Sequence, residues 1–89
     1  MSAHRFHLGR LVATPGALEL IEELEAFPYL GRHSSGDWGD LCAEDRRENE
    51  RALRVGARIF SAYETPAGRV WILTEADRSS TCILLPEEY

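Results

Sequence analysis

RIFSAYETPAGRVWILTEADRSSTCILL, residues 58–85, is the stretch that decides the fold of this 89-residue chain. It contains three runs rich in Ile, Val, Tyr, Trp and Phe, at residues 58–64, 69–74 and 81–85. Short clusters of turn-forming residues at 65–68 and 75–79 separate these runs. β-Branched and aromatic residues favour strands, and short turns between strands favour hairpins. The stretch therefore predicts three strands joined as an antiparallel meander.

The N-terminal part of the chain predicts one strand followed by one helix. Residues 6–13 alternate loosely, which predicts a strand with Leu8 and Val12 on one face. The hydroxyl of Thr14 can cap a helix and Pro15 has a fixed φ that suits the first helical position, so we expect a helix over 15–25. The apolar positions of this helix recur at three- and four-residue spacing and form one stripe: Ala17, Leu20, Ile21 and Leu24.

The residues that follow this helix predict a break and then a loop. Pro28 is expected to break or restart the helix, because proline lacks the backbone N–H that a helix interior needs. A short helical turn through Tyr29 and Leu30 is expected next. The loop after it contains three glycines: Gly31, Gly36 and Gly39.

A longer helix is expected over residues 41–54, with Asp40 as its cap and Gly56 as its terminator. Helical spacing places Asp45 and Asn49 on the apolar side of this helix. Two polar side chains that point inward need hydrogen-bond partners. They would either hold a neighbouring loop by binding its backbone or contribute to a ligand site.

These elements predict an α+β fold in a single domain, residues 1–89. We expect a small antiparallel sheet with two or three helices packed on one face. The sheet would consist of the three-stranded C-terminal meander and the N-terminal strand, which either pairs at an edge or lies beside it. Because a chain of this length buries only about 60% of its unfolded surface, a homodimer would supply burial that one copy lacks.

The composition bounds the partners and the compartment. The net charge of −5 and the pI near 5.1 oppose binding to nucleic acid and favour a basic or neutral partner. The two cysteines, Cys42 and Cys82, are far apart, and there is no signal peptide and no long apolar run. We therefore expect a cytoplasmic protein with reduced thiols and no membrane association. No cofactor is expected.

Trp38 stands between two glycine-aspartate pairs in the sequence GDWGD, residues 36–40. Indole offers a large contact surface with one hydrogen-bond donor, so Trp38 is a candidate binding residue. The alternative is that Trp38 plugs the loop onto the sheet, while the glycines permit the backbone angles that such a loop needs.

His33 precedes Asp37 by four residues, and an imidazole oriented by a carboxylate is typical of general-base catalysis. Glu75 could supply a further carboxylate from the end of a predicted strand. Asp77 and Arg78 lie at the same strand end and are candidate binding residues. A divalent metal could recruit His33, Asp37, Asp45 and Glu75, whose oxygen-rich ligands suit Mg²⁺, Mn²⁺ or Ca²⁺. Their spacing matches no metal motif, so we assign no metal site.

Several segments together resemble a group of small bacterial proteins carried on plasmids and integrated mobile elements. The segments are LGRLVATPGALE, RHSSGDWGDL with EDRRENERAL, RIFSAY, and VWILTEADRSSTCILLPEEY. Some members of that group are labelled restriction-modification subunits. A methyltransferase needs a large cofactor domain and an Asn-Pro-Pro-aromatic or similar motif, neither of which this sequence has. The resemblance thus implies an accessory protein of mobile DNA.

Two functional hypotheses follow. The first is a non-catalytic accessory protein of a plasmid or other mobile element that acts by binding another, unidentified protein. The second is a small hydrolase, with or without a divalent metal, that uses His33 with Asp37 or Glu75. The hydrolase requires these groups to converge around a pocket.

Overall fold

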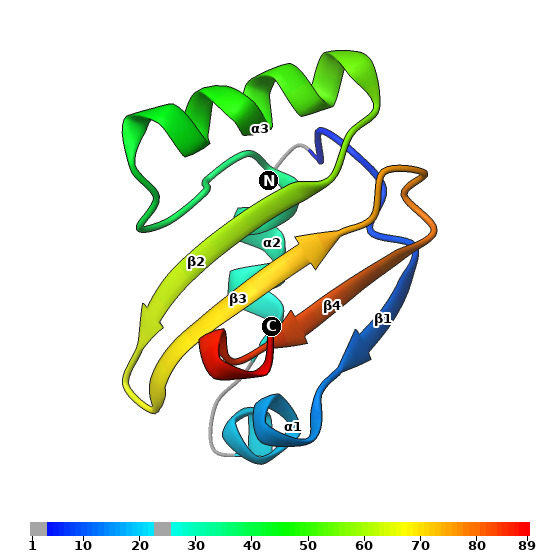
Figure 1. The fold of residues 1–89 in the computed structure, drawn as a ribbon. Coiled ribbons are helices and arrows are strands. Elements are labelled where there is room, and N and C mark those ends of the chain that lie inside the picture. The colour runs from blue at the N-terminus through cyan, green and yellow to red at the C-terminus, as the bar shows by residue number, and fades with distance from the viewer. Residues whose placement is uncertain (1–3, 23–25) are drawn as a thin grey trace.

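The computed structural model, which describes residues 4–22 and 26–89, is built around one four-stranded sheet (Figure 1). The strand order is β1-β4-β3-β2, and the strands are β1 (Arg10–Ala13), β2 (Ile59–Thr65), β3 (Gly68–Thr74) and β4 (Ser80–Leu84). The last three strands form the antiparallel meander. β1 pairs with β4 in parallel, so the sheet is mixed. The predicted α+β fold and the meander are confirmed, and the N-terminal strand takes the edge position.

Three helices and one short 3-10 turn surround the sheet. The helices are α1 (Pro15–Glu22), α2 (Phe27–Ser34) and α3 (Ala43–Val55), and the turn is η1 (Pro86–Glu88). In Figure 1, α2 lies behind the sheet, α3 runs beside the edge strand β2, and η1 lies in front of β3 and β4. No helix in the described ranges is long and apolar enough to cross a membrane.

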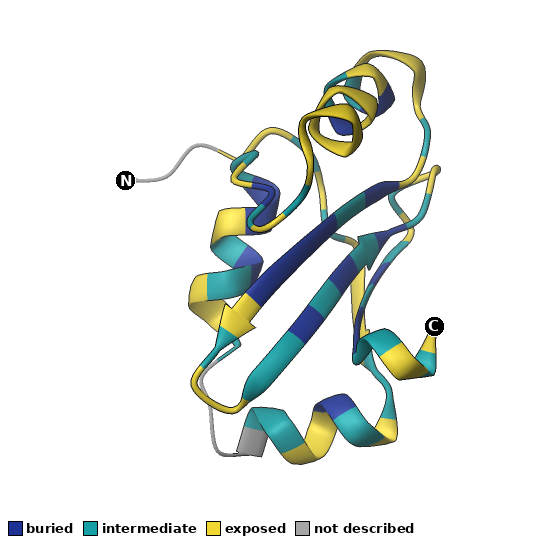
Figure 2. Cartoon of the chain, turned by 60° about the vertical axis from the view of Figure 1, so that its left-hand side comes forward, coloured by how far each residue is buried: buried dark blue, intermediate teal, exposed yellow. Residues whose placement is uncertain are grey.

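The two faces of the sheet differ in how far they are covered. The inner face, which packs against α2, carries buried side chains in register across the strands: Ser61, Tyr63, Val70, Ile72, Thr74, Thr81 and Ile83. The outer face carries two buried residues, Ala62 and Leu84, and four that are half-buried: Phe60, Trp71, Leu73 and Cys82. Figure 2 shows the buried residues concentrated in the strands and on the sheet-facing side of α2. Most of the core therefore lies on the inner face.

The start of α1 is capped as the sequence predicts, and also by a residue that the sequence did not indicate. Oγ1 of Thr14 accepts the backbone N–H of Ala17 at 3.3 Å. The carboxylate of Glu88, in η1, accepts the N–H groups of Gly16 and Leu85, each at 3.0 Å. The described part of α1 ends at Glu22, so the predicted end at residue 25 and the predicted stripe position at Leu24 lie outside the described residues.

The first strand is shorter than the predicted range of 6–13, because Gly9 bends the chain. Gly9 has a φ of +67°, and a Cβ there would lie 2.4 Å from the carbonyl oxygen of Arg78. Only glycine fits this position. Leu8 consequently packs against the inner core, whereas Val12 lies on the outer face. The prediction that Leu8 and Val12 share one face is wrong.

Two boundaries in the middle of the chain also differ from the prediction. Pro28 restarts the helix as expected, in the first turn of α2, but α2 continues through Gly31 to Ser34. His33 is therefore on a helix and not in a loop. α3 begins at Ala43 after Cys42, without a side-chain cap, so Asp40 is not its cap. Gly56 ends α3 with a φ of +75°, as predicted.

Candidate functional site

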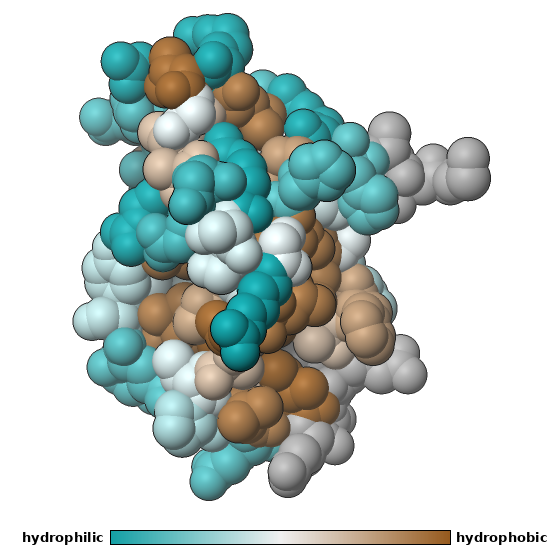
Figure 3. Space-filling model, turned by 90° about the vertical axis from the view of Figure 1, so that its right-hand side faces the viewer, coloured by the Kyte–Doolittle hydropathy of each residue, from teal (hydrophilic) through white to brown (hydrophobic). Residues whose placement is uncertain are grey.

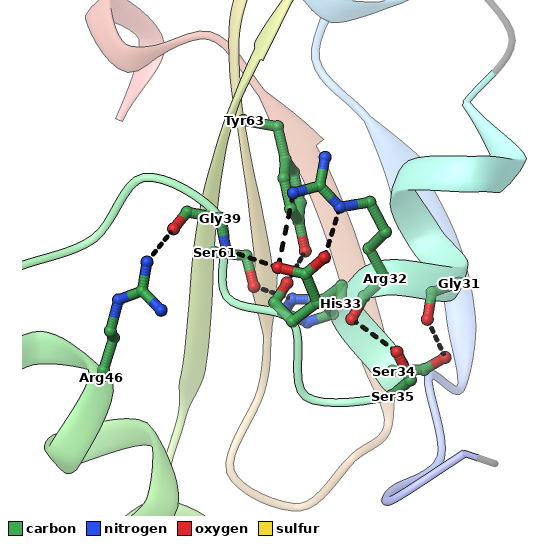
Figure 4. Close-up of polar contacts among 10 residues, drawn as sticks. Gly31, Arg32, His33, Ser34, Ser35, Gly39, Arg46, Ser61 and Tyr63 are labelled. Carbon is green, nitrogen blue, oxygen red and sulfur yellow. Dashed lines mark hydrogen bonds and ion pairs between the residues drawn. The ribbon is translucent and has the colours of Figure 1, made fainter. Parts of the chain in front are cut away.

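A continuous chain of hydrogen bonds crosses the buried core and includes the strongest catalytic candidate. Nδ1 of His33 lies 2.5 Å from Oγ of Ser61, and Nε2 lies 2.9 Å from Oγ1 of Thr74. Oγ1 of Thr74 is 2.7 Å from Oγ1 of Thr81, which donates to the carbonyl oxygen of Leu8 at 2.7 Å. Figure 4 shows the imidazole of His33 directed at Ser61. The chain thus joins α2, all three strands of the meander and the N-terminal segment.

The carbonyl at the end of this chain determines where the protons are. A carbonyl oxygen can only accept, so the hydroxyl of Thr81 donates its proton to the carbonyl of Leu8. Thr81 must therefore accept the hydrogen bond from the hydroxyl of Thr74. Thr74 in turn must accept from Nε2–H of His33. The neutral imidazole then has a bare Nδ1, which accepts the hydroxyl proton of Ser61. One tautomer satisfies every group.

This serine-histidine pair has the contacts of a nucleophile and its base, but it has no access to a substrate. His33, Ser61 and Thr74 are all 0% exposed. The third member is a threonine hydroxyl, which lacks the charge that stabilises an imidazolium. Burial, followed by the charge of Arg78, lowers the pKa of His33 to about 3, so the imidazole stays neutral near pH 7. The arrangement holds the core together.

The carboxylates predicted to assist His33 have other partners. Asp37 accepts hydrogen bonds from Nε–H of Arg32 at 2.7 Å and from the N–H of Gly39 at 3.3 Å. The hydrogen bond from Arg32 holds the pKa of Asp37 below its usual range. Glu75 forms two 3.2 Å hydrogen bonds with the guanidinium of Arg58. The structure therefore does not bring His33, Asp37 and Glu75 together.

Trp38 is buried, as the plug interpretation expects. Its side chain is 3% exposed and clusters with Ala52 and Ile59. Its Nε1–H donates to Oε2 of Glu50 at 3.1 Å, and Glu50 also accepts two hydrogen bonds from Arg5. The indole is thus enclosed between α3 and the sheet, and no broad face is free for a partner.

Asn49 and Asp45 differ in burial, although helical spacing places them on one side of α3. Asn49 is 4% exposed, and its amide both donates to the carbonyl of Phe60 at 2.6 Å and accepts the N–H of Phe60 at 3.1 Å. Asp45 is exposed. The prediction that both side chains point inward is correct for Asn49 and wrong for Asp45. Asn49 holds the edge of β2 and does not bind the loop at 36–39.

Arg78 and Asp77 hold the turn between β3 and β4. Asp77 accepts the N–H of Ser79 at 2.9 Å. Arg78 has a φ of +60°, and its guanidinium donates to four carbonyl groups at 2.6–3.1 Å: those of Ala52, Ala57, Glu75 and Ala76. Two of these lie at the carboxyl end of α3, where a positive charge is favourable. Arg78 is a structural link between α3 and the turn.

A groove on the outer face includes two candidates from the sequence, Asp45 and Asn49, together with aromatic side chains that the sequence did not single out. It has a volume of about 380 Å³ and is lined by Asp45, Glu48, Asn49, Arg58, Phe60, Trp71, Leu73 and Tyr89. The ring centroids of Phe60 and Trp71 are 4.9 Å apart at 85°, and those of Trp71 and Tyr89 are 5.5 Å apart at 68°. Three aromatic rings therefore stand at steep angles beside two carboxylates of α3.

One signal in the sequence could have indicated this groove. β3 reads RVWILT at 69–74, with apolar residues on both faces, whereas a strand with one face in water alternates apolar and polar residues. Trp71 and Leu73 are the outward residues of that run. An unbroken apolar run in a sheet with helices on one face indicates a surface that a partner could cover.

A second apolar surface lies on the β1 side of the molecule. It contains exposed Leu11, Val12, Leu18 and Phe27, at 48%, 41%, 53% and 79%. Figure 3 faces this side and shows apolar atoms gathered over β1 and α1. The homodimer expected from the sequence stays a prediction. A single monomeric mass at every concentration in sedimentation equilibrium would contradict it.

Metal ligands and thiols show no cluster in the described ranges. No three His, Cys, Asp or Glu side chains there lie close enough together to hold a metal ion. Cys42 is exposed and Cys82 is half-buried, and both are free thiols. Burial raises the pKa of the Cys82 thiol, which makes it less reactive.

Comparisons with known proteins add no family. The chain matches no protein-family model, no curated protein and no solved structure.

Proposed function

We propose that this chain is a non-catalytic accessory protein that acts by binding another protein through the groove on its outer face. The proposal is supported by the contrast between the candidate catalytic groups and the groove on the outer face. The groups suited to catalysis are buried or paired with structural partners. The groove, in contrast, is open and presents aromatic side chains beside unpaired charge, as protein-binding surfaces do.

Association with a plasmid or other mobile element is the second half of the proposal. It rests on the resemblance of the segments around GDWGDL and TEADRSS to proteins carried on such elements. The small size and the net charge of −5 suit an accessory factor that binds a basic or neutral region of a larger protein.

Affinity capture with matched charge variants tests the binding function. Glu48→Arg reverses a charge in the groove, and Glu44→Arg makes the same change on α3 outside it. Both positions are exposed, so both variants should keep the fold, and Glu44→Arg, in the first turn of α3, should cost about 0.3–1 kcal/mol. We expect tagged wild-type protein and Glu44→Arg to recover the same partner from the host, and Glu48→Arg to recover at least about fivefold less.

Equal recovery by all three proteins would show that the groove is not the binding surface. Recovery of no specific partner by the wild-type protein would contradict the binding function itself. Circular dichroism of each variant checks that the fold is intact.

A further inference from the structure

We propose that the outer-face groove binds an arginine side chain of the partner protein. This inference rests on the proposed function, which supplies a protein as the partner. In this site the planar guanidinium lies against the aromatic rings of Trp71 and its neighbours, with the carboxylates of Asp45 and Glu48 at the rim.

The aromatic rings provide the first part of the argument. Trp71 makes edge-to-face contacts with two rings, Phe60 at 85° and Tyr89 at 68°, with centroids 4.9 and 5.5 Å away. Phe60 and Trp71 are half-buried and Tyr89 is 72% exposed, so part of this aromatic surface is open to the groove. A cation within about 6 Å of an indole face is attracted by the ring quadrupole. The aromatic lining therefore offers a surface on which a flat cation can lie.

The charges at the rim provide the second part. Asp45 and Glu48 are exposed carboxylates of α3, and none of the ion pairs in the described part of the chain involves either of them. Arg58, the one basic residue in the lining, is neutralised by Glu75 at 3.2 Å. The groove therefore has an unbalanced negative charge, and its complement is a cation.

The aromatic and carboxylate lining of the groove favours arginine among the cations of proteins. A guanidinium is planar, stacks on aromatic faces and pairs with a carboxylate through two parallel hydrogen bonds. Lysine supplies a compact, strongly hydrated charge that gains less from stacking. The 380 Å³ volume is at the small end of the range of ligand pockets, so it suits one side chain and not a folded element.

Two short peptides that differ only in charge test this inference. Acetyl-Gly-Arg-Gly-amide is titrated into ¹⁵N-labelled protein, with acetyl-Gly-citrulline-Gly-amide as the neutral isostere. We expect the arginine peptide to shift the indole N–H signal of Trp71 with a roughly millimolar Kd, and the signal of buried Trp38 to stay in place. The citrulline peptide should bind about tenfold more weakly.

Charge variants separate the carboxylates from the rings. Asp45→Asn with Glu48→Gln should weaken arginine binding about fivefold and leave citrulline binding unchanged, whereas Glu44→Gln should change neither. The Trp71 signal is assigned from the spectrum of Trp71→Phe. Because the three altered carboxylates are exposed, these variants should fold like the wild type.

Three results would overturn the inference. These are equal affinity for both peptides, no shift of the Trp71 signal, and an affinity for the arginine peptide that is unchanged in the Asp45→Asn, Glu48→Gln variant. Each of these leaves the proposed function standing if Glu48→Arg still fails to capture the partner, because a neutral segment would then occupy the groove. If the wild-type protein captures no partner but still binds the arginine peptide, the proposed function alone is contradicted.

Discussion

At the scale of single residues, Asn49 shows how one side chain closes an open backbone. Phe60 faces the free edge of β2, where its N–H and C=O have no strand to pair with. The amide of Asn49 satisfies both groups at 3.1 and 2.6 Å. An amide is suited to this position because it carries a donor and an acceptor side by side. Asn49 thus takes the place of a neighbouring strand.

Replacement of Asn49 should be costly. Asn49→Ala leaves two buried backbone groups without partners, so we expect the free energy of unfolding to fall by about 1–3 kcal/mol. Asn49→Asp keeps the acceptor but sets a buried carboxylate oxygen against the carbonyl of Phe60, so its loss should be at least as large as that of Asn49→Ala. Urea denaturation measures both changes. Arg51→Ala, at an exposed position of the same helix, serves as the control. A loss for Asn49→Ala no larger than for Arg51→Ala would show that water replaces the amide.

At the scale of elements, the start of α1 depends on a residue from the opposite end of the chain. Glu88 accepts the N–H of Gly16 and the hydroxyl of Thr14, and it also closes its own turn on Leu85. A carboxylate is favourable at a helix start, where unpaired N–H groups point outward. The hydrogen bond from Thr14 accordingly holds the pKa of Glu88 below its usual range. η1 and α1 therefore stabilise each other.

Hydrogen exchange tests this coupling. Glu88→Ala should speed exchange of the amides of Gly16 and Ala17, because the carboxylate and the position of Thr14 are both lost. Glu87→Ala removes an exposed neighbouring carboxylate and should leave these amides unchanged. Equal protection in both variants would show that α1 is held by Thr14 alone.

Elements were also the scale at which the sequence predicted best. No end of the three meander strands differs from its predicted position by more than one residue, because turn clusters and strand-forming residues are local signals. The end of α2 was missed for a non-local reason. Gly31 disfavours a helix on its own, and α2 extends past it because Leu30 and His33 are buried against the sheet and Ser34 is buried against the N-terminal segment.

At the scale of the whole molecule, the buried hydrogen-bond chain couples stability to pH. Folding lowers the pKa of His33 from 6.5 to about 3. Between these two values the unfolded chain binds a proton that the folded chain excludes, so stability falls as the pH falls through this window. The slope should reach about 1.4 kcal/mol per pH unit. Carboxylates with lowered pKa, such as Asp37 and Glu50, add their own loss at lower pH.

The contribution of His33 is isolated by comparison with His33→Gln, which has no titratable group at this position. Urea denaturation of both proteins at several values between pH 4.5 and 7 should give a steeper decline for the wild type. Parallel curves would mean that a neutral imidazole is not required by the core.

The sequence by itself determined the α+β class, the meander, the cap by Thr14 and the termination of α3 by Gly56. Each of these depends on residues within a few positions of one another. Only the tertiary structure decided that His33 pairs with Ser61 and Thr74 rather than Asp37, and that Trp38 is covered while Trp71 is not. Those outcomes depend on which side of α2 faces the sheet and which sheet face lacks a helix. Both are set by packing between segments that are distant in the chain, and the local pattern of the sequence does not specify that packing.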